Sequence, residues 1–195
     1  MGVALEQKDP WWKSAVLYQI YPRSYADSSG TGTGDLRGIT EKLPYLADLG
    51  IDAIWISPFF KSPMKDFGYD VEDHRRVDPL FGTNGDFDVL LARAHDLGIR
   101  VLIDLVLSHC AETHPWFQAC LQGKGSPFDD AFIWADPAPD GGPPNNWLSV
   151  FGGPAWTFNE TRQQYYLHNF LKSQPDLNYH AKIVREEALS IARYW

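Results

Sequence analysis

The sequence predicts an α/β fold in which short buried strands run parallel and alternate with helices. Residues 51–56 and 99–103 form nearly unbroken apolar runs, as expected of strands that are covered on both faces. The segment between them carries apolar residues at helical spacing, at Phe87, Leu90 and Ala94. Because strand–helix–strand connections are right-handed, this order predicts one parallel sheet.

Each expected element is bounded by residues that start or stop it. Pro22 ends the first strand, and Gly50 and Gly98 end the two helices. Thr83 or Asn84 could cap the second helix at its start. In chain order we expect a strand at 16–21, a loop at 27–38, a helix at 39–49, a strand at 51–58, a helix ending at 97 and a strand at 99–103.

The pattern changes after the third strand. Residues 109–174 are irregular and rich in Pro, Gly, Trp and Asn. A structureless loop of this length is improbable in a compact domain, so we expect an inserted subdomain or a lid. A helix is expected again at 184–195, with Leu189, Ala192 and Trp195 facing inward.

The composition narrows the classes of partner. With 17 Lys and Arg against 25 Asp and Glu, the formal net charge is −8, so neither nucleic acid nor an anionic membrane is expected as a partner. Cys110 and Cys120 are too few for a secreted disulfide scaffold, and we expect free thiols. Residues 1–10 lack the basic and apolar parts of a signal peptide, and no apolar stretch could span a membrane. We therefore expect a cytoplasmic protein.

Polar side chains follow both internal strands. Asp104 and His109 come after the third strand, and Asp66 and Tyr69 come after the second. Since α/β barrels carry their chemistry at the carboxyl ends of the strands, we expect these side chains to meet in one site. Carboxylates and aromatic rings suit a sugar, because charged acceptors bind its hydroxyls and rings stack on its apolar faces.

A string of motifs runs in order along nearly the whole chain. The motifs are Trp11-Trp12, Gln19 to Ser24, Gly34-Asp35-Leu36, Ser57-Pro58, Asp66 to Asp70, Phe81-Gly82-Thr83, Asp104 to His109, His114 to Phe117, Asn145-Asn146-Trp147, Tyr166 to Phe170 and Gln174 to Asn178. Together they resemble the α-amylase family, glycoside hydrolase family 13, and within it the bacterial α-glucosidases and oligo-1,6-glucosidases. Any one motif is weak evidence, whereas the ordered string is strong evidence.

The resemblance implies the N-terminal part of a (β/α)₈ TIM barrel with a subdomain inserted after the third strand. The first three β/α units would occupy residues 1–108, and the inserted subdomain, domain B, residues 109–174. Residues 175–195 would return to the barrel as its third helix, and the chain would stop before the fourth strand.

The resemblance also implies a retaining mechanism, which needs a nucleophilic carboxylate and a carboxylic acid roughly 5 Å apart. In the family these follow the fourth and fifth strands, so both are expected beyond Trp195 and no catalytic residue is expected in this chain. The chain alone is predicted to be inactive, and the C-terminal part of the same barrel is its expected partner. No cofactor is expected to be required.

Half of a glucose-binding pocket would lie in this chain, again by resemblance. Asp66 would accept hydrogen bonds from sugar hydroxyls, Tyr69 would stack under the ring, and His109 would donate to a hydroxyl near the terminal carbon. Phe151 and Phe170 would wall the pocket from the inserted subdomain.

Four other positions around the pocket have supporting or alternative roles. Gln174 would line the pocket, and Asp104 would orient its neighbours or contact the catalytic centre. Asp70 could simply cap its loop. The family usually has Asn where this chain has Ser108, whose hydroxyl lacks the paired donor and acceptor of an amide, so its role stays open.

The loop after the first strand has oxygen-bearing side chains at every second position: Asp27, Ser29, Thr31, Thr33 and Asp35. This rhythm suits a structural Ca²⁺ or Mg²⁺. However, Ser29 and Thr31 stand where the related enzymes often have carboxylate or amide ligands, and calcium affinity depends on ligand charge. The alternative is a Gly/Ser-rich turn held by hydrogen bonds to Asp35.

The leading prediction is that the complete protein hydrolyses, and could transglucosylate, short α-glucosides such as maltose, isomaltose or sucrose. One alternative is a sucrose or maltose isomerase or transglucosylase of the same family. An alternative from another class is a non-catalytic member, either a sugar-binding fragment or the ectodomain of an amino-acid transporter heavy chain. Transporter heavy chains carry an N-terminal transmembrane helix and tend to lose the pocket residues, whereas this chain keeps Asp66, Tyr69 and His109.

Overall fold

The computed structural model describes residues 9–195 in two compact units. The first unit comprises the chain up to Ser57 together with Gly85–Ile103, and the second comprises Pro58–Asn84 and Asp104–Trp195. The expectation about residues 1–10 falls mostly on residues 1–8, which lie outside the described part. Among the described residues, no helix is both long enough and apolar enough to cross a membrane.

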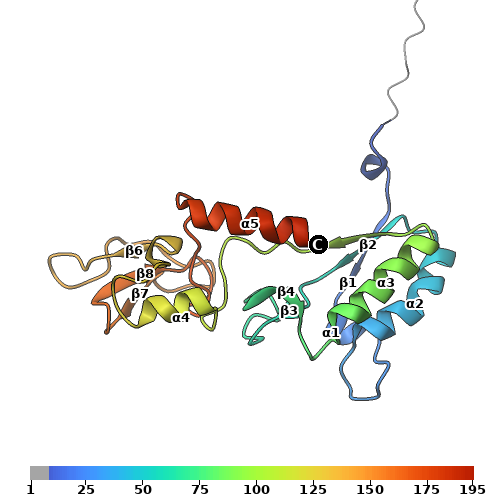
Figure 1. Ribbon diagram of the computed structural model, residues 1–195, viewed down its shortest axis with the longest axis horizontal. Coiled ribbons are helices and arrows are strands. Elements are labelled where there is room, and N and C mark those ends of the chain that lie inside the picture. The colour runs from blue at the N-terminus through green and yellow to red at the C-terminus, as the bar shows by residue number, and fades with distance from the viewer. Residues whose placement is uncertain (1–8) are drawn as a thin grey trace, which may run out of the picture. The chain divides into compact units, whose positions relative to one another are not determined.

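The first unit is built on a three-stranded parallel sheet, which confirms the predicted strand order. Strands β1 (Leu17–Ile20) and β5 (Arg100–Ile103) flank the central strand β2 (Ala53–Ile56) (Figure 1). Ala53 lies opposite Leu17 on one side and opposite Arg100 on the other. The central strand is the most apolar of the three, as expected of a strand with a partner on each side.

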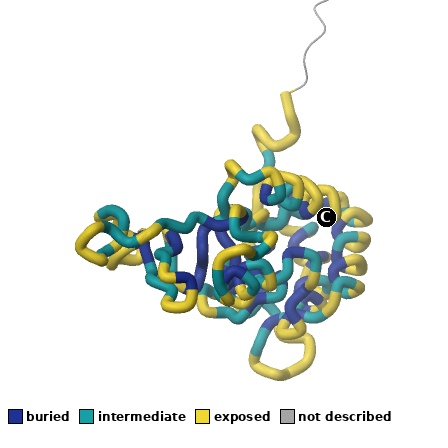
Figure 2. Tube along the Cα trace, turned by 60° about the vertical axis from the view of Figure 1, so that its left-hand side comes forward, coloured by how far each residue is buried: buried dark blue, intermediate teal, exposed yellow. Residues whose placement is uncertain are grey.

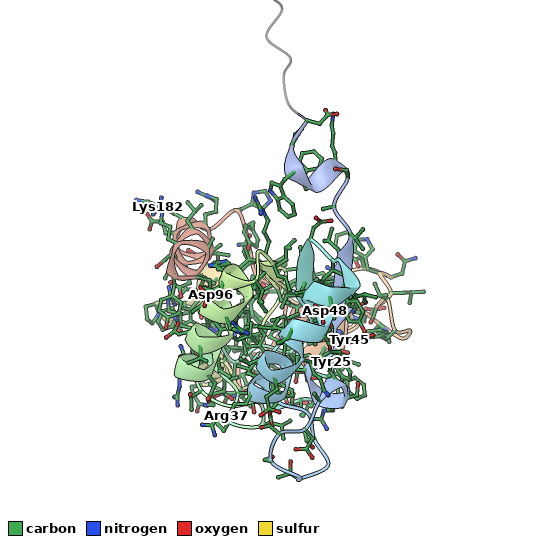
Figure 3. All side chains as sticks on the ribbon, turned by 90° about the vertical axis from the view of Figure 1, so that its right-hand side faces the viewer. Tyr25, Arg37, Tyr45, Asp48, Asp96 and Lys182 are labelled. Carbon is green, nitrogen blue, oxygen red and sulfur yellow. The ribbon has the colours of Figure 1, made fainter. Side chains whose placement is uncertain are left out.

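Helices α2 (Leu36–Leu49) and α3 (Asn84–Asp96) lie side by side on one face of this sheet (Figures 1 and 3). Helix α2 begins three residues before the predicted start, because the Asp35 carboxylate caps it by accepting from the Gly38 amide at 2.7 Å. It ends at Gly50, whose φ of 83° is left-handed. A salt bridge of 2.7 Å from Arg37 to Asp86 links the two helices.

Two short helical segments of the first unit were not predicted. These are η1 (Trp11–Lys13) and α1 (Pro22–Tyr25). Pro22 stops β1, as expected, but it also starts α1, because proline has no N–H to lose in the first turn of a helix. The turn packs so closely on α2 that a Cβ at Gly38 would lie 2.1 Å from the Ala26 carbonyl oxygen.

The second unit contains two small antiparallel sheets. Strands β3 (Phe60–Lys61) and β4 (Asp73–Val77) pair with each other. A three-stranded sheet has the order β6 (Trp134–Ala135), β8 (Gln164–Leu167), β7 (Trp156–Asn159). The helices of this unit are α4 (Pro115–Leu121), η2 (Asp129–Ala131) and α5 (Lys182–Tyr194) (Figure 1). Residues 109–174 are thus more regular than predicted.

The core of the second unit is aromatic. Phe117 is buried, with its ring stacked on Trp134 at 5.8 Å and edge-on to Phe132 and Tyr166. Cys110 and Cys120 belong to the same cluster, and both are buried free thiols, as predicted. The aromatic rings supply most of the buried apolar surface in a segment that has few aliphatic residues.

The predicted inward face of α5 is wrong at two positions. Val184 and Ile191 are buried, whereas Leu189 and Ala192 are exposed. Trp195 does face inward, since its ring stacks on Phe60 at 5.2 Å. Contacts with β4 select this face: the Glu187 carboxylate accepts from Arg75 at 2.5 Å, and the Trp195 indole donates to the His74 carbonyl oxygen at 2.6 Å.

Candidate functional site

The second unit contains a cavity of about 860 Å³. Its walls come from the loop between β3 and β4, from the segment that follows β5, and from three aromatic side chains farther along the chain. The lining residues are Asp66, Tyr69, Asp104, Leu105, Val106, Leu107, Ser108, His109, Phe151, Phe170 and Tyr179. Six of the seven residues predicted to bind substrate therefore line one cavity.

Gln174 does not line the cavity but lies directly behind it, fully buried. Its amide oxygen accepts from the Leu171 backbone N–H at 3.0 Å, which fixes the amide orientation. The amide nitrogen then donates to Asp66 Oδ2 at 2.8 Å. The buried Gln174 amide thus holds the Asp66 carboxylate in position.

His109 is 4 % exposed and lines the cavity. Its Nε2 lies 3.1 Å from the Tyr69 carbonyl oxygen and 3.2 Å from the Gln174 amide nitrogen, and its Nδ1 lies 2.9 Å from Ser108 Oγ. The Tyr69 carbonyl oxygen only accepts and favours a proton on Nε2, with the Ser108 hydroxyl then donating to Nδ1, whereas the Gln174 amide nitrogen only donates and favours an Nε2 without a proton. Burial is the main cause that lowers the pKa of His109 below 6.5, and the ring is therefore neutral at pH 7.

Tyr69 and Asp104 meet at the cavity wall, where the phenol donates to Asp104 Oδ2 at 3.2 Å. Burial is the largest cause that raises the pKa of Tyr69, and the negative charge of Asp104 adds to it. The hydroxyl thus keeps its proton at neutral pH and presents the Asp104 carboxylate in a fixed direction.

Two phenylalanine rings also line the cavity. The Phe170 ring lies 4.9 Å from the His109 ring and 5.9 Å from the Phe151 ring. Phe151 is 58 % exposed, yet its backbone is held in place because Ser149 Oγ accepts from the Phe151 N–H and donates to the Phe170 carbonyl oxygen at 2.6 Å. An exposed apolar ring at a cavity mouth is available to a ligand.

Tyr179 also lines the cavity and was not predicted. Its hydroxyl donates to the Leu107 carbonyl oxygen at 2.8 Å, which fixes the segment between Asp104 and His109. The available signal was its position directly after the motif that ends at Asn178.

The loop predicted to bind a metal is exposed over residues 27–32 (Figure 2). Asp27 accepts from the backbone N–H groups of Ser29, Gly30 and Gly32, and Asp35 accepts from those of Ser28 and Gly38. The side chains of Ser29 and Thr31 lie 3.2 Å apart, and the Thr31 hydroxyl lies 3.4 Å from the Thr33 carbonyl oxygen. Within residues 9–195, no group of three or more His, Cys, Asp or Glu side chains could hold a metal ion. A cation would compete with the N–H donors, and the metal site stays a prediction.

Comparison with known proteins extends over almost the entire chain. The family described as "Alpha amylase, catalytic domain" matches residues 19–195. A probable α-glucosidase of Rhizobium meliloti is 60 % identical over 191 residues, covering 98 % of this chain and 35 % of its own length. The rat amino acid transporter heavy chain SLC3A1 is 48 % identical over 188 residues, covering 95 % of this chain and 27 % of its own.

A solved structure agrees closely with the fold. The crystal structure of the α-glucosyl transfer enzyme XgtA matches with a TM-score of 0.94 at 60 % identity, covering 95 % of this chain and 35 % of that one. The chain thus spans about a third of the length of the proteins it matches. It belongs to the α-amylase family, glycoside hydrolase family 13, whose catalytic domain is a TIM barrel.

Proposed function

We propose that the full-length protein carrying this chain is a retaining α-glucosidase that acts on short α-glucosides. The observation that carries the proposal is the cavity that Asp66, Tyr69, Asp104 and His109 line together with two aromatic rings. A glucose ring needs charged acceptors for its hydroxyls and an apolar surface for its ring face. The cavity offers both.

In this proposal each side chain has a distinct role. Asp66 accepts from sugar hydroxyls, Tyr69 stacks under the ring, and His109 donates from Nε2 to a hydroxyl in place of the Tyr69 carbonyl. Phe151 and Phe170 close the apolar side. The buried amide of Gln174 supports Asp66, and Asp104 orients Tyr69 through its hydroxyl.

The domain organisation is part of the same proposal. Residues 1–108 and 175–195 would form the first β/α units of a (β/α)₈ barrel, and residues 109–174 a subdomain inserted after its third strand. The antiparallel sheet of β6, β8 and β7 supports this division, because it lies between β5, the last strand of the parallel sheet, and helix α5. The nucleophile and the proton donor would come from the rest of the full-length protein, and residues 1–195 alone would not turn over substrate.

Two other activities remain as candidates. XgtA, the structural match at 60 % identity, is described as an α-glucosyl transfer enzyme, which favours transfer to a sugar or alcohol acceptor. The match to a transporter heavy chain favours a non-catalytic member. The buried Asp66–Gln174 contact favours an enzyme over the latter, because it orients a carboxylate toward the cavity.

The test uses the full-length protein and 4-nitrophenyl α-D-glucopyranoside. We expect release of nitrophenol, with α-glucose as the first-formed anomer by NMR, since two displacements retain configuration. Asp66→Ala should lower kcat/KM by about tenfold or more, because bonds to a charged acceptor are strong. Asp140→Ala, in an exposed loop, is the control and should change it less than about twofold.

The outcomes separate the candidates. An Asp66→Ala variant within twofold of the parent excludes the proposed role of Asp66. Glucosylated acceptors in place of free glucose identify a transglucosylase. Absence of turnover in a folded full-length protein identifies the non-catalytic class.

A further inference from the structure

We propose that Asp70 is a positioning residue that imposes the conformation of the loop carrying Asp66 and Tyr69. The inference rests on the proposed sugar pocket and adds a residue that does not line it. The loop runs from Ser62 to Asp70, between β3 and β4, within the second unit.

The Asp70 carboxylate is fully buried and lies under this loop. Oδ1 accepts from the Ser62 hydroxyl at 2.9 Å and from the Asp66 backbone N–H at 3.0 Å, and Oδ2 accepts from the Lys65 backbone N–H at 2.9 Å. These three donors are neutral groups of the loop itself. One side chain thus fixes the loop at three points, as backbone-capping carboxylates do.

The loop needs such support because its backbone is strained. Met64 and Phe67 have φ angles of 60° and 51°, in the left-handed region that side chains other than glycine disfavour. Gly68 has a φ of 103°, and a Cβ there would lie 2.7 Å from the Pro58 carbonyl oxygen. Three left-handed residues within five positions would not persist without surrounding contacts that determine them.

The hydrogen bonds to Asp70 also determine where the pocket residues lie. Asp70 holds the Asp66 N–H, and the Asp66 carbonyl oxygen accepts from the Tyr69 N–H at 3.0 Å. The Tyr69 carbonyl oxygen in turn lies 3.1 Å from His109 Nε2. Displacing the Asp66 backbone therefore moves the carboxylate acceptor and the stacking ring together.

The test is a double-mutant cycle in the full-length protein with 4-nitrophenyl α-D-glucopyranoside. Asp70→Asn keeps the volume but replaces one acceptor oxygen by a donor. We expect it to lower kcat/KM by about tenfold or more, because small displacements of binding groups are costly. In an Asp66→Ala background the same change should cost less than it does in the parent, since one of the two groups being positioned is gone and only Tyr69 remains.

Asp78→Asn is the matched control. Asp78 is also buried and accepts from backbone N–H groups, those of Ser62 and Leu80, but does not hold Lys65 or Asp66. It should destabilise the fold while leaving kcat/KM of the folded enzyme within about twofold. A residue that serves stability alone would lower the stability of the fold without changing kcat/KM, so the control separates stability from positioning.

Hydrogen exchange gives a second readout that does not depend on activity. In Asp70→Asn, peptides covering Lys65 and Asp66 should exchange faster than in the parent. If Asp70→Asn does not fold, Ser62→Ala can replace it, because it removes one donor to the same carboxylate. We expect Ser62→Ala to raise the exchange rate of the same peptides by a smaller amount.

Parent-like kinetics and exchange in Asp70→Asn would overturn the proposal, as would a loss that is undiminished in the Asp66→Ala background. If Asp66→Ala itself has no effect, the proposed function fails while the exchange measurement still tests Asp70.

Discussion

The phenol of Tyr69 donates a hydrogen bond of 3.2 Å to the Asp104 carboxylate. This contact joins the β3–β4 loop to the segment that follows β5, two parts of the second unit that are far apart in sequence. Both residues line the cavity, so the bond fixes the angle between a ring and a carboxylate that would face the same ligand.

Separate substitutions distinguish the ring of Tyr69 from its hydroxyl. Tyr69→Phe keeps the ring and should lower kcat/KM of the full-length enzyme by less than about tenfold, the effect of one hydrogen bond. Tyr69→Ala removes the ring as well and should lower it by about 100-fold. Equal losses in the two variants would mean that the hydrogen bond to Asp104, and not the ring, is what matters.

Phe67 offers a way to measure the backbone strain in the loop between β3 and β4. Its φ is 51° and its side chain is 62 % exposed, so little packing offsets the strain. Phe67→Asn should raise the free energy of unfolding by about 0.5–1 kcal/mol, because asparagine tolerates the left-handed region. Leu148→Asn, at a more exposed position with an ordinary φ, should give no gain in the same denaturant titration. A loss in the Phe67 variant would show that its ring makes a stabilising contact.

The guanidinium of Arg162 depends on Asp129. The Arg162 side chain is 3 % exposed, lies 2.5 Å from Asp129 and also donates to the carbonyl oxygens of Cys120 and Gly123. Asp129→Asn leaves a buried cation without its counter-charge and should cost about 3 kcal/mol of unfolding free energy. Asp136→Asn breaks an exposed pair with Lys124 and should leave the unfolding free energy almost unchanged. Similar costs for both variants would contradict this account.

Stability should fall on the acid side because of His114. Its Nδ1 accepts from the Trp116 N–H and caps α4, and burial is the main cause that lowers its pKa from 6.5 to about 4. Below pH 6.5 the unfolded chain binds a proton that the folded ring does not. Stability is therefore fully present above pH 6.5 and falls by about 3 kcal/mol as the pH drops toward 4.

The measurement is the unfolding free energy against pH. His114→Asn keeps a capping oxygen but cannot titrate, so its curve should be flatter between pH 6.5 and 4. His95→Asn, at an exposed position, should follow the parent. The charged and titratable groups around the His114 ring are His74, Glu187, Asp73 and Glu72. An unchanged slope in His114→Asn would assign the acid sensitivity to other groups, such as His74 and His168, whose pKa values burial also lowers.

The two long helices of the first unit could be predicted because their patterns persist over many residues, and its strands because apolar runs alternate with those helices along the chain. Helix α2 has 14 residues and α3 has 13, enough for helical spacing to be distinct. Strands β6, β7 and β8 are just as short, but Thr, Asn and Gln interrupt the apolar residues of β7 and β8 and no long helix lies between them, so nothing in the local pattern marks them. In α5 the spacing allowed more than one inward face, and the contacts with Arg75 and His74 that decide between them are remote in sequence.

In the candidate site, too, some residues could be placed from the sequence and others could not. Asp104 and His109 could be placed from their position after a strand, and Asp66 and Tyr69 from the motif around them. The supporting contacts could not be predicted. Gln174 reaches Asp66 across 108 positions of sequence, and Asp70 bonds backbone groups whose direction depends on left-handed residues. Such contacts follow from the folded chain path and have no local signature.

The burial of Cys110 and Cys120 has a kinetic meaning. The thiolate is the reactive form of cysteine, and burial raises the pKa of both thiols, that of Cys110 strongly. A thiol reagent can therefore react only when the aromatic cluster around them opens. The rate at which the two sulfurs are labelled under native conditions therefore measures how often the core of the second unit opens.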